Sequence, residues 1–181
     1  MRVIFWVMSC LLMFCGTALA VQRSEAKASL VDSNGQNVGE AMLKEVPGGV
    51  KIQLKASKLS PGAHGLHIHA VGKCDPPDFK SAGDHFNPYG MKHGMLNVQG
   101  GAHAGDLPNI SVGSDGTADA EILAERITLG TGENSLFQPG GTSLIIDATL
   151  DDERTDPADN AGDRIACGVI ESPPKASVNR R

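Results

Sequence analysis

Histidine residues are concentrated in one short part of this sequence. All six lie between His64 and His103, and three of them belong to the stretch AHGLHIHAVGKC, which ends at Cys74. On an extended strand, His67 and His69 would project from the same face, because they are two residues apart. Two neighbouring imidazoles on a rigid strand can bind a borderline metal such as copper or zinc. Taken alone, the pair is equally compatible with two surface histidines.

A second group of possible ligands follows in a Gly-rich stretch. His85 lies in AGDHFNP, His93 lies in MKHGM, and His103 lies in GGAHAGDLPN, where Asp106 follows three residues later. Three imidazoles and one carboxylate supply the four ligands of a closed tetrahedral zinc site. Zinc bound there would stiffen a loop that has little core of its own. The alternative is a polar surface loop with unrelated histidines.

The elements that must position these ligands are short strands joined by turns. Alternation of apolar and polar residues, interrupted by Asn-Gly and Pro-Gly-Gly, predicts antiparallel hairpins over residues 26–32, 38–46 and 50–56. Further strands are expected over residues 65–70, 117–123, 143–149 and 164–170. The resulting seven or eight strands are typical of an all-β sandwich or Greek-key barrel.

Residues 71–109 do not follow a strand pattern and are rich in Gly, Pro, Asn and His. A loop of this length inside a compact domain is uncommon unless it is functional or cross-linked. This one contains Cys74 and three of the possible ligand histidines. A bound metal and a disulfide could therefore supply the order that regular structure does not.

The first twenty residues have the features of an export signal. Arg2 is followed by the apolar run VIFWVMSCLLMFC and then by GTALA, which ends in the small-x-small pattern of a cleavage site. We expect removal of residues 1–20, which leaves one domain over residues 21–181 with a frayed tail from about residue 171. The apolar run is shorter than a membrane span, and no other segment approaches the required length. The sequence thus predicts an exported protein, periplasmic or extracellular.

Cleavage changes the cysteine and charge counts. Two of the four cysteines, Cys10 and Cys15, would leave with the signal; acylation of one of them in a lipoprotein is the less favoured alternative. The remaining pair, Cys74 and Cys167, would form a disulfide in an oxidising compartment, the alternative being two buried thiols. The mature chain would carry 15 Lys and Arg against 21 Asp and Glu, a balance of −6. That charge argues against nucleic acid and anionic membranes as partners.

Five motifs of the chain together resemble one known family. HGLHIHAVGKC, SAGDHFNP, KHG, HAGDLPN and NAGDRIACGVI are similar, in this order, to the successive signatures of the copper/zinc superoxide dismutases. The resemblance covers about residues 26–170. It implies a Greek-key β-sandwich or flattened barrel of about eight antiparallel strands, with long metal-binding and electrostatic loops. It also implies conversion of the superoxide anion to hydrogen peroxide and oxygen, by a monomer or homodimer.

The resemblance further implies two metal ions in each subunit, one copper and one zinc, which share one imidazole. In the matched motifs the copper ligands are His67, His69 and His85, and the zinc ligands are His85, His93, His103 and Asp106.

Other matched residues would support the two metals. Arg164 would attract and orient the anion beside copper, and His85 would take up a proton at its copper side and deliver it to peroxide. Asp151 would link copper and zinc ligands from the outer shell. His64 matches a structural histidine of the family, and Cys74–Cys167 matches the disulfide that attaches the long loop to the barrel.

One position departs from the family pattern. In GTSLIIDATLDD, Asp147 stands where the family has a fourth copper-binding histidine, and no histidine follows His103. A carboxylate could complete a Cu(II) site, but it would disfavour Cu(I) and oppose an incoming anion. Asp147 could instead pair with Arg164 or a lysine, or mark a protein that no longer uses copper. Two functions therefore remain: an exported superoxide dismutase, with Asp147 as a source of impairment, or a non-catalytic relative that binds zinc, copper or both.

Overall fold

The computed structural model describes residues 24–156 and 160–172. The expected signal peptide and most of the expected tail lie outside these residues. Among them, no helix is long and apolar enough to cross a membrane.

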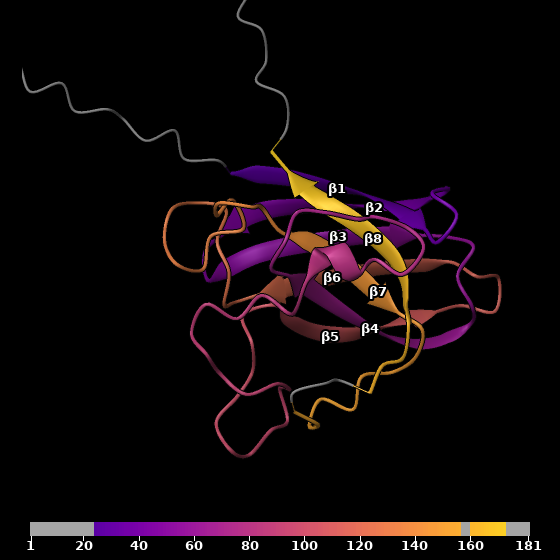
Figure 1. Cartoon of the computed structure of the whole chain (residues 1–181). Helices are drawn as coiled ribbons and strands as arrows, with labels where there is room; N and C mark the ends of the chain where they lie inside the picture. Colours follow the sequence, from indigo (N-terminus) through magenta and orange to yellow (C-terminus); the bar gives the residue numbers. More distant parts are fainter. Residues whose placement is uncertain (1–23, 157–159, 173–181) are drawn as a thin grey trace, which may run out of the picture.

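In the described part of the chain, eight antiparallel strands form one sheet that curls into a nearly closed barrel (Figure 1). The strands are β1 (Glu25–Asp32), β2 (Asn37–Val46), β3 (Gly49–Ala56), β4 (Gly62–His69), β5 (Asp106–Val112), β6 (Ala118–Ala124), β7 (Ser143–Asp147) and β8 (Arg164–Glu171). Their order in the sheet is β5-β4-β7-β8-β1-β2-β3-β6, so the connections β3–β4, β5–β6 and β6–β7 join strands that are not hydrogen-bonded neighbours. The predicted all-β fold class is confirmed.

Alternation of buried and exposed side chains explains most of the half of the barrel built from β1, β2, β3 and β6. Apolar residues such as Leu43 and Ile52, which are register partners, are buried in the core. The intervening residues are exposed and form ion pairs, for example Lys51 with Glu121 at 2.8 Å. The alternation predicted from the sequence therefore separates an apolar interior from a charged outer face.

Strand β4 differs because both of its faces are covered. Leu66 and Ile68 belong to the barrel core, whereas His67 and His69 project to the opposite side. All four side chains are buried, since long loops cover the outer surface of β4. The expectation that His67 and His69 share one face is confirmed, and that face lies outside the barrel interior.

The prediction that residues 71–109 lack regular structure is partly wrong. It contains a short 3₁₀ helix, η1 (Lys80–Ala82), and strand β5 begins at Asp106. In β5, Pro108 interrupts the apolar pattern, but the strand lies at an edge of the sheet, where a proline is tolerated. Pairing of Leu107 with Leu66 of β4, rather than local pattern, defines this strand. The strand expected over residues 65–70 starts three residues after the observed β4 and ends one residue after it, and the strand expected over 143–149 ends two residues after the observed β7.

Candidate metal centre

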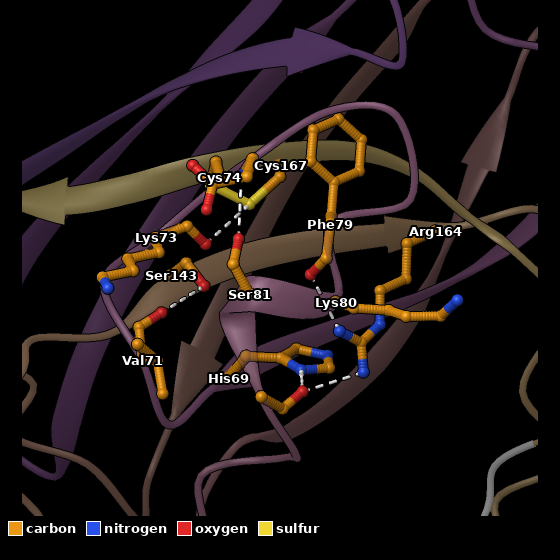
Figure 2. Close-up of a disulfide and its surroundings, with 12 residues drawn as sticks. His69, Val71, Lys73, Cys74, Phe79, Lys80, Ser81, Ser143, Arg164 and Cys167 are labelled. Atoms are coloured by element: carbon orange, nitrogen blue, oxygen red, sulfur yellow. Dashed lines mark hydrogen bonds between the residues drawn. A yellow bond between two sulfur atoms is a disulfide. The ribbon is translucent and has the colours of Figure 1, made fainter.

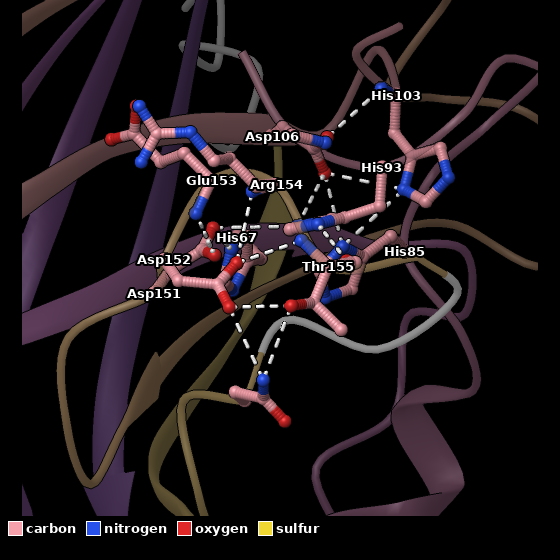
Figure 3. A network of polar contacts seen from close by, with 12 residues as sticks. His67, His85, His93, His103, Asp106, Asp151, Asp152, Glu153, Arg154 and Thr155 are labelled. Carbon is pink, nitrogen blue, oxygen red and sulfur yellow. Dashed lines mark hydrogen bonds and ion pairs between the residues drawn. The ribbon is translucent and has the colours of Figure 1, made fainter. Parts of the chain in front are cut away.

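The four predicted zinc ligands converge at the start of β5. Asp106 Oδ1 lies 3.0 Å from His85 Nδ1 and 3.2 Å from His103 Nδ1, and the two imidazole nitrogens are 3.4 Å apart. Ligands about 2.0–2.1 Å from a tetrahedral ion are separated by roughly 3.3 Å, so this triangle fits zinc. His93 Nε2 lies 3.7 Å from the same carboxylate oxygen. Figure 3 shows the four side chains pointing toward one another.

Backbone groups fix the Asp106 carboxylate from its other side. Its Oδ2 accepts hydrogen bonds from the Gly94 N–H at 2.8 Å and from the His103 N–H at 2.9 Å. Burial raises the pKa of Asp106, but hydrogen bonds from His103, His85 and the Gly94 N–H outweigh it and hold the pKa far below its usual value. The group is therefore an anion, as a metal ligand requires.

The zinc-side cluster continues directly into the predicted copper ligands. Possible ligand atoms of His67, His85, His93 and Asp106 all lie within 4.8 Å of one another. The rings of His67 and His85 are stacked, with centroids 4.1 Å apart, and the His69 ring meets His85 edge-on at 4.8 Å. His85 thus lies between the zinc-side ligands and the two histidines of β4, and its Nδ1 faces the zinc side.

His69 has one ring nitrogen free to bind a metal. Its Nδ1–H donates a hydrogen bond to the Gly83 carbonyl at 2.8 Å, whereas its Nε2 is buried without a hydrogen-bond partner. Among the described residues, His93 Nε2 is the other buried side-chain nitrogen without a well-aligned hydrogen bond, although Asp151 Oδ2 lies 3.3 Å from it. Burial, followed by the charges of His85 and Arg164, holds the pKa of His69 well below its usual value. A neutral imidazole with a buried, unpartnered nitrogen fits a metal ligand.

Asp151 contacts one histidine from each of the two groups of ligands. Its Oδ2 lies 3.0 Å from His67 Nε2 and 3.3 Å from His93 Nε2 (Figure 3). Burial raises the pKa of Asp151, but hydrogen bonds from His67, from His93 and from the Glu153 N–H prevail and lower the pKa to about 2. The side chain stands where the resemblance places the linking aspartate.

Asp147 lies against His67. Its Oδ2 is 2.8 Å from His67 Nδ1, and its side chain is 5% exposed. Its backbone carbonyl lies 2.7 Å from His64 Nδ1, and His64 Nε2 is 2.8 Å from the Ser60 carbonyl. His64 therefore ties backbone segments together, which agrees with the structural role expected of it.

Arg164 is held beside His69 by the long loop. Its guanidinium donates to the Phe79 carbonyl at 2.9 Å and to the Gly83 carbonyl at 2.8 Å (Figure 2). The Gly83 oxygen also accepts the hydrogen bond from His69, so one peptide positions both side chains. Arg164, His69, His85 and Asp147 line one open cavity of about 870 Å³.

The predicted disulfide between Cys74 and Cys167 is present, with Cα atoms 5.6 Å apart (Figure 2). It attaches the loop that contains Phe79 and Gly83 to β8, three residues beyond Arg164. The predicted pairing is confirmed, and it joins the cavity wall to the barrel.

Comparison with known proteins agrees with this geometry. The sequence model of the family described as "Copper/zinc superoxide dismutase (SODC)" matches residues 37–170, which include every ligand discussed above. The chain belongs to the copper/zinc superoxide dismutase family. It is similar to Cu-Zn superoxide dismutase 1 of Aquifex aeolicus, with 50% identity over 151 residues that cover 82% of this chain and 89% of that protein.

Other members of the copper/zinc superoxide dismutase family carry a different name. The superoxide dismutase-like protein YojM of Bacillus subtilis is 42% identical over 144 residues, which cover 78% of this chain and 73% of that protein. A crystal structure of a SOD-like protein from Bacillus subtilis superposes with a TM-score of 0.76 at 38% identity, covering 79% of this chain and 96% of that one. The relatives therefore include proteins named as dismutases and proteins named only as dismutase-like.

Gly105 positions two of the proposed zinc ligands, a role that was not predicted from the sequence. Gly105 donates a hydrogen bond to the Phe86 carbonyl and accepts one from the Ile68 N–H, both at 2.8 Å. A Cβ at Gly105 would lie 2.2 Å from the Ile68 carbonyl oxygen. Only glycine allows this approach, which brings His85 and His103 to β4. The signal was the glycine in HAGD, between two predicted zinc ligands.

Proposed function

We propose that this chain is an exported superoxide dismutase that converts superoxide to hydrogen peroxide and oxygen. Copper would be held by His67, His69 and His85. Zinc would be held by His85, His93, His103 and Asp106. The observation that carries the proposal is the shared position of His85, between a zinc-like triangle of ligands and a cavity that contains Arg164. The relatives named as Cu-Zn superoxide dismutases support it.

The side chains of the cavity have distinct tasks in this reaction. Copper, when bound, supplies one-electron exchange in both directions. Arg164 attracts the superoxide anion and orients it, because two backbone carbonyls fix the guanidinium at the cavity wall. The Nε2 of His85, opposite the zinc-side Nδ1, would hold a proton in the part of the cycle in which it is not a copper ligand, and would deliver that proton toward the product. The zinc ligands keep His85 in place and stabilise the loop.

The proposal is tested with purified mature protein loaded with copper and zinc. We expect one copper and one zinc per chain and superoxide dismutation above the rate of the metal-free protein. Replacing Arg164 with Ala should lower the rate constant for superoxide by about tenfold or more, because the charge that steers the anion is lost. Arg126→Ala, at an exposed position after β6, is the matched control and should leave the rate unchanged. Both metals bound with no turnover would contradict the proposal.

A second function is favoured by the acidic residue in the cavity. Asp147, which the resemblance aligns with the family's fourth copper-binding histidine, places a carboxylate beside His67 in the cavity. Together with the relatives named dismutase-like, this supports a non-catalytic protein that binds zinc, copper or both. Zinc alone in the purified protein, with negligible turnover after copper addition, would favour this function over the first.

A further inference from the structure

Asp147 contacts the ring nitrogen of His67 that does not contact Asp151. His67 Nε2 lies against Asp151, which belongs to the support behind the cluster. His67 Nδ1 is directed to the other side, where Asp147 Oδ2 is 2.8 Å away. His69, whose unpartnered Nε2 is also a copper-side donor, lines the same cavity as Asp147. A buried carboxylate oxygen therefore contacts one imidazole nitrogen proposed to bind copper, in the cavity that His69 and His85 also line.

The separation of these atoms fits two ligands of one ion. Adjacent donors on a tetragonal Cu(II), with bonds of roughly 2.0 Å, lie about 2.8 Å apart. A tetragonal arrangement of nitrogen and oxygen donors is the one that Cu(II) prefers. The hydrogen bond between His67 Nδ1 and Asp147 Oδ2 has this length, so a copper ion could bind both atoms with little change in their separation.

The carboxylate is also fixed in its position. Asp147 is the last residue of β7 and is the register partner of Arg164 in β8. Its backbone carbonyl contacts His64, and its side chain lies beside Gly65, where an added Cβ would come within 3.2 Å of Asp147 Oδ2. A ligand that is buried and held in this way is pre-organised for the metal.

We propose that Asp147 is the fourth copper ligand, so that Cu(II) is bound by three imidazole nitrogens and one carboxylate oxygen. The inference rests on copper binding at the site proposed above, but it does not require dismutase activity. The negative charge favours Cu(II) over Cu(I), because the divalent ion gains more from a neighbouring anion. This chain would then favour Cu(II) over Cu(I) more strongly than a site with four histidine ligands does.

Electron paramagnetic resonance of the Cu(II)-loaded, zinc-loaded protein tests the ligand set directly. We expect three coordinated imidazoles in pulsed experiments on the unchanged protein and four in Asp147→His. In Asp147→His, g∥ should fall and the copper hyperfine splitting should increase, as oxygen is replaced by nitrogen. The ratio of Cu(II) to Cu(I) affinity should fall by at least about tenfold in the same variant. Asp84→Asn removes another carboxylate that lines the cavity and should leave the spectrum unchanged.

A second variant separates loss of the ligand from loss of the fold. Asp147→Asn keeps the size of the side chain but removes its charge, and its spectrum should also shift while the zinc content stays at one per chain. Spectra of Asp147→His and Asp147→Asn that match the unchanged protein would overturn the inference. If that result came with full dismutase activity, the proposed function would stand without it. If Cu(II) did not bind through the histidines at all, both would be wrong.

Discussion

At the scale of single residues, Asp151 contacts ligands of both proposed metal sites, although it binds no metal itself. Its carboxylate lies within 3.3 Å of imidazole nitrogens from both proposed sites. Its own position is fixed by the Asn109 side chain, which accepts a hydrogen bond from the Asp151 N–H at 2.9 Å. Asp151 therefore orients one ligand of each metal at the same time.

Replacing Asp151 with Asn should weaken the binding of both zinc and copper by about 10- to 100-fold, because a neutral amide orients the two imidazoles less strongly. Competition with a chromophoric chelator measures both affinities. Asp119→Asn is the matched control, since Asp119 is an exposed partner of Lys55 on the outer face of the barrel. An unchanged affinity for one of the two metals would show that Asp151 supports a single site.

At the scale of elements, the long loop after β4 is held in place by one covalent link and many hydrogen bonds. Cys74 joins it to Cys167 of β8 across a sequence separation of 93 residues. Between these points the loop supplies the Phe79 and Gly83 carbonyls that accept hydrogen bonds from Arg164. Loss of the link should therefore affect both stability and the cavity.

Replacing both Cys74 and Cys167 with Ala should lower the free energy of unfolding by about 4 kcal/mol, mainly because the unfolded chain gains entropy. Denaturant unfolding of the unchanged protein, with and without reductant, should show a comparable loss. Reductant should have no effect on the double variant, which serves as the control. If reductant lowered the stability of both proteins equally, the loss would not arise from this disulfide.

Elements and ligands differ in how far they could be predicted from the sequence. Strands with a clean two-residue alternation, such as β3, were predicted within a residue of their ends. Strand β5 was missed, because its pairing with β4 is a long-range contact and Pro108 hides the local pattern. The shared face of His67 and His69 could be predicted from their spacing, whereas their assignment as copper ligands came from the family resemblance and stays a prediction. The orientation of His93, whose Nδ1 lies 2.9 Å from the Thr155 carbonyl, depends on a segment that returns from 62 residues away.

At the scale of the whole molecule, the proposed export can be tested on the mature protein. Trp6 is the only tryptophan of the chain and lies within the expected signal. A protein secreted by its natural route should begin at about Val21 by intact mass and should lack tryptophan fluorescence. A secreted product that retains Trp6 and its emission would contradict cleavage at this position. The same chain expressed without transport serves as the control and should show that emission.

The arrangement of β4 and β7 has a consequence for how such a protein can diversify. Leu66, Ile68, Leu144 and Ile146 fill the barrel, while the histidines and Asp147 project from the reverse side of the same strands. Along each of these strands, alternate positions thus supply the possible metal ligands and the side chains of the barrel core. A donor atom can be exchanged for another kind without repacking the interior. One scaffold can therefore host metal sites of different redox preference, and selection can act on the two sides independently.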